Sequence, residues 1–130
     1  MKQRMQKELE LLRKYYPDIE YKQEGHWFYI PSYPLQDGWN RDTTEIAFRV
    51  KNGYPGTPPY AFFVPKGLKY DGSKPKNYKE NPSQSPPFKG NWGCISWSHT
   101  SDWNPTSSLK TGSNLLHWVN SFKKRFEEGV

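Results

Sequence analysis

Cysteine is almost absent from this sequence: Cys94 is the single thiol in 130 residues. One cysteine excludes an internal disulfide. The sequence also lacks an apolar run long enough to span a membrane, and no early apolar run resembles a signal peptide. We therefore expect a protein of the reducing cytoplasm that has no membrane as a partner.

Aliphatic side chains are also few, because hydrophobic residues make up 33% of the chain and aromatic residues alone account for 17%. The core must therefore depend on large rings, each of which buries much apolar surface. The length suits one core, so we expect residues 1–130 to form a single domain. The net charge of +6 favours an acidic protein, a nucleic acid or an anionic surface as a partner.

The histidines form no metal-binding pattern. His26 has no cysteine, histidine or carboxylate at a spacing typical of metal ligands, and a lone histidine is more often a structural or surface residue. We therefore do not expect His26 to bind a metal ion.

Apolar residues recur at helical spacing near both ends of the sequence. Residues 1–16 predict an amphipathic helix that Pro17 ends, with charged side chains mostly on the other faces. A second helix is expected to begin between Thr106 and Ser113, where several hydroxyls offer caps, and to continue to Phe126. The basic face of the first helix is either plain solvated surface or a docking face.

Between these helices, apolar and aromatic residues cluster in short runs separated by turn formers. The clearest run alternates Ile46, Phe48 and Val50 with other residues, as a half-buried strand does. Short turns between the runs favour an antiparallel meander. We expect four strands, at Ile19–Tyr21, His26–Ile30, Thr44–Val50 and Tyr60–Val64.

Two connections have unusual compositions. The turn Tyr54–Pro59 contains three prolines, which fix the backbone and make it a rigid connector. Residues 65–89 have no periodicity and contain six lysines, so we expect a long irregular loop that is either a functional flap or locally disordered. Because this loop leads directly to Cys94, a molecule that it binds would arrive near the thiol.

Cys94 is either a small buried hydrophobe or a nucleophile, and its neighbours decide between the two. Ser96 lies on the same face as Cys94 if this run is extended. His99 and Asp102 follow on a turn that could fold back to supply a base. Gly93 leaves room for backbone amides or a flexible tail to approach.

Three short motifs occur in a fixed order along the chain. They are Tyr54, Pro55, Pro58 and Pro59 of a Tyr-Pro-x-x-Pro-Pro turn, Cys94 and Ile95 at the start of an apolar segment, and Trp103 and Pro105 of a Trp-x-Pro. With these motifs, the whole chain resembles the ubiquitin-conjugating (UBC) fold, and most closely its compact bacterial members. The resemblance implies an α+β fold with an N-terminal helix, a four-stranded antiparallel meander, a long active-site loop and one C-terminal helix.

The resemblance also implies a reaction. Cys94 would accept a ubiquitin-like protein from an activating enzyme as a thioester and pass it to a nucleophile on a protein target, in a bacterial ubiquitin-like conjugation pathway. Cysteine suits this role because its thiolate is both a strong nucleophile and a good leaving group. This reaction needs no metal ion and no other cofactor in this chain. The first helix would contact the activating enzyme, and that enzyme, not this chain, would use ATP.

The sequence departs from this family at the His-Pro-Asn motif, which usually stands shortly before the cysteine and is missing here. In the family, its asparagine supports the oxyanion or the active-site loop. Asn91 and Asn77 are candidates for this role by residue type alone, and Ser96 and His99 are candidate groups beside the thiol. The basic loop 65–89 is longer than the usual connection, and its charge suits an acidic patch on the modifier.

Two other functions stay open. The missing motif suits an inactive binding module of the same fold that only holds a ubiquitin-like protein. The positive charge and the aromatic residues of the loop are also typical of domains that bind single-stranded nucleic acid. No nucleic-acid-binding motif is present, so we rank this third function last.

Overall fold

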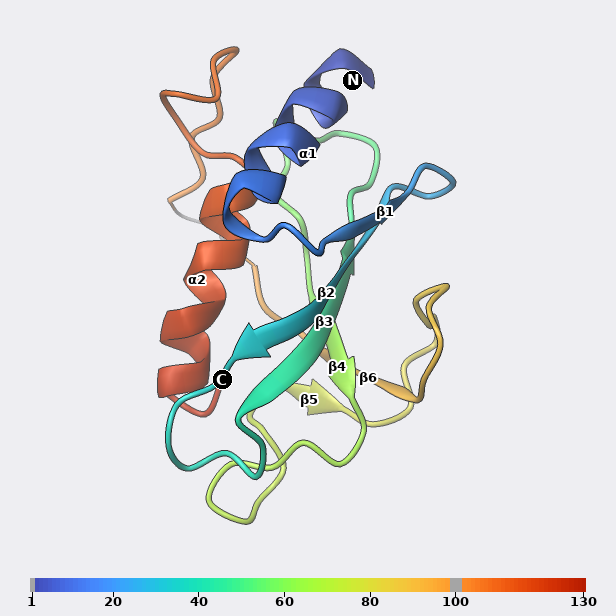
Figure 1. The fold of residues 1–130 in the computed structure, drawn as a ribbon, viewed down its shortest axis with the longest axis vertical. Helices are drawn as coiled ribbons and strands as arrows, with labels where there is room; N and C mark the ends of the chain where they lie inside the picture. The colour runs from blue at the N-terminus through green and yellow to red at the C-terminus, as the bar shows by residue number, and fades with distance from the viewer. Residues whose placement is uncertain (1, 99–101) are drawn as a thin grey trace.

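The computed structural model describes residues 2–98 and 102–130, which fold into two helices and one antiparallel sheet (Figure 1). The predicted α+β class is therefore confirmed. The helices are α1 (Lys2–Tyr15) and α2 (Leu115–Glu127). The strands are β1 (Glu20–Lys22), β2 (Trp27–Pro34), β3 (Thr43–Arg49), β4 (Phe62–Pro65), β5 (Tyr78–Lys79) and β6 (Trp92–Ile95).

Within the described ranges the sheet has six strands in the order β1-β2-β3-β4-β6-β5, and each neighbouring pair is antiparallel. Strands β1 to β4 follow one another as the expected meander. The prediction of four strands is wrong, because β6 returns to pair with β4, and β5 pairs with the other edge of β6. β5 has two residues and β6 has four, and runs this short carry too little alternation to be identified from sequence.

The main core lies between the sheet and the helices, which cover one side of it (Figure 1). Phe62 on β4 stacks on Phe122 of α2 with 4.2 Å between ring centroids. Phe48 on β3 meets the Trp118 ring of α2 edge-on at 6.3 Å. Aromatic rings therefore contribute strongly to this core, as the composition predicts. The buried residues of α2 are Leu115, Trp118, Val119, Phe122 and Phe126.

The opposite face of the sheet carries a smaller apolar group, which we call the outer cluster. The outer cluster results from the alternation of side chains along a strand. On β4, Phe62 and Val64 point into the main core, and Phe63 between them points to the opposite face. The connection between β5 and β6 extends on the side away from α2 (Figure 1). The buried members of the outer cluster are Trp27, Ala47, Phe63 and Trp92, and the partly buried residues packed on it are Tyr29, Phe88 and Cys94.

The N-terminus of α2 lies later in the chain than the sequence predicts. Asn114 caps the helix, because its side-chain oxygen accepts a hydrogen bond from the backbone N–H of His117 at 3.0 Å. The predicted start between Thr106 and Ser113 is wrong. Its hydroxyls stabilise an irregular connection instead, as when the Ser113 hydroxyl accepts a hydrogen bond from the Asn104 N–H at 2.9 Å.

A buried carboxylate joins α1 to α2. Glu8 is only 1% exposed, and its Oε1 accepts a hydrogen bond from the backbone N–H of Leu115 at 2.6 Å. Its Oε2 accepts hydrogen bonds from the Tyr54 hydroxyl and, at 3.0 Å, from Arg4 Nε. Burial, followed by the charge of Glu8, raises the pKa of Tyr54, which keeps its hydroxyl protonated as a donor.

The segment from residue 65 to 89 is more ordered than an irregular loop. It contains β5, and Leu68, Pro75 and Pro86 are buried. Tyr70 forms β-bridges to both Trp39 and Ser73. The prediction of a long connection therefore holds, but the expectation of irregular structure throughout it is wrong. Single prolines and aromatic residues anchor the segment without any periodic pattern.

Candidate active site around Cys94

Cys94 lies on β6 between two neighbouring strands. Its Cα partner on β4 is Phe63, and its Cα partner on β5 is Lys79. Directly opposite residues of antiparallel strands place their side chains on the same face of the sheet. The thiol therefore stands between an aromatic ring and a lysine, where it is partly buried against the outer cluster.

This environment opposes ionisation of the thiol. Burial raises the pKa of Cys94 above its ordinary value, and the charge of Lys79 lowers it in part. A thiol with a raised pKa is mostly protonated at neutral pH. The nucleophilic thiolate therefore forms more readily when additional positive charge approaches or when the site becomes more exposed.

The connection between β5 and β6 is fixed against the outer cluster next to Cys94. The Phe88 ring stacks on Tyr29 at 4.9 Å between centroids, and the Phe88 carbonyl accepts a hydrogen bond from Trp92 Nε1 at 3.1 Å. Lys22 Nζ lies 5.0 Å from the centroid of the Phe88 ring and donates to the Pro87 carbonyl at 2.5 Å. These contacts contribute to the partial burial of the sheet face that carries the thiol.

The structure places the candidate polar residues around both ends of β6. Ser96 follows β6, is exposed, and donates its backbone N–H to the Asn77 carbonyl at 2.9 Å. Asn91 precedes β6, is exposed, and accepts a hydrogen bond at its carbonyl from the Lys66 N–H at 2.9 Å. Their roles in chemistry stay predictions.

The remaining candidates fall outside this arrangement. Asn77 has a positive φ of 59° and donates from Nδ2 to the Val130 carbonyl at 3.4 Å, so its amide already has a partner. Asp102 is exposed. His99 lies outside the described residues, and its proposed role as a base stays a prediction.

Gly93 has a packing role that the sequence does not reveal. A Cβ atom at this position would lie 2.4 Å from Cε1 of Tyr78, far inside a normal contact. The Tyr78 ring thus fills the space that we expected to be open for a backbone or a flexible tail. The absence of a side chain at Gly93 lets β5 pack closely against β6.

The first and third sequence motifs are brought together. Trp103 Nε1 donates a hydrogen bond to the Pro55 carbonyl at 2.7 Å, and the Trp103 and Tyr54 rings lie 6.1 Å apart. Pro59 is buried in the same turn, whereas Pro58 and Pro105 are partly buried. These residues stabilise the connection between β6 and α2. The hydrogen-bonded Tyr54 also links this region to α1 through Glu8.

Lys79 and Phe63 are the neighbours of Cys94 that sequence reasoning did not single out. Lys79 was one of six lysines in a segment without periodicity, and no pattern placed it in a strand. Phe63 belongs to an expected strand, but its pairing with Cys94 requires the chain to return to β4 after the connection formed by residues 66–91. Only the register of β4, β6 and β5 reveals both contacts.

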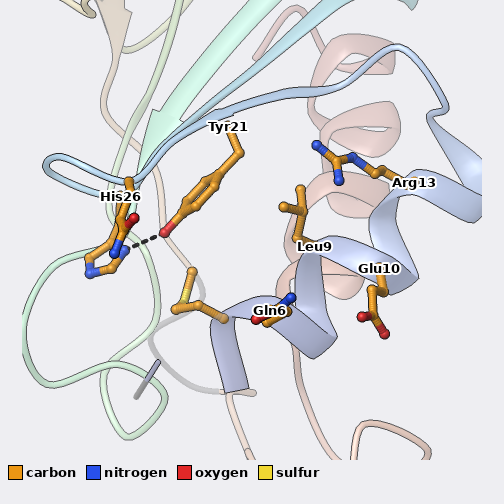
Figure 2. Close-up of a pocket in the computed structure, with 8 residues that line it drawn as sticks. Gln6, Leu9, Glu10, Arg13, Tyr21 and His26 are labelled. Carbon is orange, nitrogen blue, oxygen red and sulfur yellow. Dashed lines mark hydrogen bonds between the residues drawn. The ribbon is translucent and has the colours of Figure 1, made fainter. Parts of the chain in front are cut away.

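A separate groove of about 300 Å³ lies between α1 and the turn that joins β1 to β2 (Figure 2). Leu9 and Met5 provide apolar surface, and the Tyr21 hydroxyl and His26 Nδ1 form a hydrogen bond of 2.6 Å at its side. The other lining residues are Gln6, Glu10, Arg13 and Gln23. β1 and β6 are four strand spacings apart, about 19 Å, so this groove is distant from the thiol.

Together these features describe a small α+β protein. Its single thiol is partly buried and lies near one edge of the sheet. No family model, curated protein or solved structure matches this chain. No helix within residues 2–98 and 102–130 is long and apolar enough to cross a membrane. The same residues contain no group of three or more His, Cys, Asp or Glu side chains that could hold a metal ion.

Proposed function

We propose that this chain has a UBC-like fold and acts as a ubiquitin-conjugating-type carrier in a bacterial cytoplasm. Cys94 accepts a ubiquitin-like protein from an activating enzyme and transfers it to a protein target. The observation that carries the proposal is the setting of the only thiol, which is partly exposed and has a lysine as its cross-strand partner. The contact between Trp103 and Pro55 supports it, since it joins two motifs of the resemblance.

The proposed reaction has two acyl transfers. In the first, the Cys94 thiolate attacks the carbonyl carbon of the thioester on the activating enzyme, and the thiolate of that enzyme leaves. In the second, a nucleophile of the target, such as an amine, attacks the new thioester, loses a proton, and expels the Cys94 thiolate. A thiol has the leaving-group ability that both steps require, and neither step changes an oxidation state.

The two distant surfaces suit this sequence of events. An activating enzyme that binds the groove at α1 is held across the sheet from Cys94, so it does not cover the thiol at its docking site. The groove offers apolar contacts from Leu9 and both charge signs from Glu10 and Arg13. Lysines of the segment between β4 and β6 attract an acidic patch on the modifier. One of them, Lys74, already forms an ion pair with Glu80 at 3.2 Å.

The test is formation of a covalent adduct. The chain is mixed with a cognate activating enzyme, ATP and the ubiquitin-like protein, and the products are separated with and without reductant. We expect an adduct that reductant removes, and no adduct with Cys94→Ala. With Cys94→Ser, we expect a reductant-resistant oxygen ester if any adduct forms. No adduct with an activating enzyme shown to load its own thiol would contradict the proposal.

The raised pKa of Cys94 favours a second candidate, an inactive module that binds a ubiquitin-like protein without forming a thioester. The Cys94→Ala variant separates the two functions. A carrier loses all pathway activity with this substitution, whereas a binding module retains both its affinity for the modifier and its activity in the pathway.

A further inference from the structure

The segment between β4 and β6 sets the backbone of one exposed lysine opposite Cys94. β5 consists of Tyr78 and Lys79, and its register sets Lys79 opposite Cys94. On one side, the Tyr78 ring packs directly over Gly93. Just before β5, the Lys76 N–H donates to the Gly129 carbonyl at 3.0 Å. The backbone of Lys79 is therefore restrained from two directions.

Other charged groups near this face are already engaged. On β3, Ala47 is the cross-strand partner of Phe63. Glu45 and Arg49 lie two residues to either side of Ala47, so they are on the same face of the sheet. Glu45 accepts a hydrogen bond from the Tyr29 hydroxyl at 2.5 Å, and Arg49 lies over the Trp27 ring at 5.3 Å. Glu80, the residue after Lys79, pairs with Lys74 at 3.2 Å.

Two strands and a connecting segment face Cys94 directly. β4 presents the uncharged Phe63, and the connection after β5 brings the uncharged Phe88 to the same cluster. β5 presents Lys79, which forms no ion pair with a carboxylate among the described residues. The charge of Lys79 is therefore available to the sulfur atom.

We propose that Lys79 supplies the positive charge that stabilises the Cys94 thiolate and, in acyl transfer, the oxyanion of the tetrahedral intermediate. The role of Lys79 toward the thiolate depends only on the pairing of β5 with β6. Its role toward the oxyanion rests on the proposed function. An ammonium group is a point charge on a flexible stem, so it can follow negative charge from sulfur to the carbonyl oxygen as the bond forms. Lys79 would thus perform the electrostatic role that the asparagine of the missing His-Pro-Asn motif has in the family.

The first experiment measures ionisation of the thiol without any partner. Cys94 is the only thiol, so the rate of alkylation by iodoacetamide between pH 6 and about 10.5, a range chosen around the ordinary cysteine pKa, reports its thiolate fraction. In Lys79→Met, we expect the midpoint to move to higher pH and the rate at pH 7.5 to fall roughly three- to tenfold. Lys79→Arg keeps the charge and should retain the profile of the unmodified chain.

Lys76→Met is the matched control, because Lys76 is an exposed lysine of the same segment but is not opposite Cys94. We expect its profile to be unchanged. Circular dichroism verifies that each variant is folded, and Lys79→Gln replaces Lys79→Met if the latter is not. Superimposable profiles for the unmodified chain and the folded, uncharged variant would overturn the proposal, as would an equal shift in Lys76→Met.

The second experiment separates the thiolate from the oxyanion. Single-turnover loading of Lys79→Met and of the unmodified chain is measured at pH 7.5, where Lys79 is charged, and each rate is divided by the thiolate fraction that alkylation gives for the same protein at that pH. A slower corrected rate for Lys79→Met supports the oxyanion role, and equal corrected rates refute it. If alkylation shifts but no variant forms a thioester with an active partner, the proposed function fails while the charge effect on Cys94 stands.

Discussion

At the scale of single residues, the local environment of Cys94 limits how its thiol can react. The thiol is not sealed in the core, because it is partly exposed and packs against the outer cluster. It is not a preformed thiolate either, since burial raises its pKa. Under the proposed function, the binding of a partner would therefore have to activate the thiol.

Gly93 provides a prediction at this scale. Gly93→Ala places a methyl group against the Tyr78 ring, so we expect a loss of about 1–3 kcal/mol in the free energy of unfolding, measured with urea. In a Tyr78→Ala background the same substitution should cost much less, because the obstructing ring is gone. Equal costs in the two backgrounds would show that the contact between Gly93 and Tyr78 does not limit the packing of β5.

At the scale of elements, Glu8 connects α1, the Tyr-Pro turn and the N-terminus of α2. Its two oxygens accept hydrogen bonds from Leu115, Tyr54 and Arg4. Burial of a carboxylate is tolerated when such donors surround it. The position of the turn therefore depends on the helices and not only on the stiffness of its prolines.

Tyr54→Phe tests this junction. The substitution keeps the ring but removes one donor from a buried carboxylate, so we expect the free energy of unfolding to fall by about 1–3 kcal/mol. Tyr60→Phe is the control, because Tyr60 is 63% exposed and should change stability by less than about 0.5 kcal/mol. Urea denaturation of both variants measures the difference, and similar small effects would contradict a structural role for the Tyr54 hydroxyl.

The elements also show what the sequence can and cannot predict. Helical spacing and Pro17 correctly predict α1, and the alternation around Phe48 correctly predicts β3. β5 was not predicted, because two residues have no period, and the hydroxyls before Asn114 gave a false start for α2. The candidate site depends on β5, so Lys79 could not be assigned to it without the register of the sheet.

At the scale of the whole molecule, the groove at α1 and the thiol lie toward opposite edges of the sheet. The sheet between them is buried on its helix-facing side. Under the proposed function, this separation would let one surface bind a partner while the other reacts. Substitutions would then remove the binding and the reaction one at a time.

Arg13→Glu reverses a charge in the groove, and under the proposed function we expect it to slow loading by the activating enzyme about tenfold. Alkylation of Cys94 by iodoacetamide should not change, because the substitution is distant from the thiol. Lys14→Glu is the matched control: it makes the same charge change on the next residue of α1, which does not line the groove. Equal loading rates for the two variants would exclude the groove as the docking surface.

The strand order carries a consequence for the pair formed by Lys79 and Cys94. β6 lies between β4 and β5 in the sheet, although β5 precedes it in the chain. Among the described residues β5 pairs with β6 alone, so it is joined to the sheet only through residues 92–95. Lys79 therefore stays opposite Cys94 only while β5 is paired, and a chain in which β5 detaches has a cysteine without its neighbouring charge.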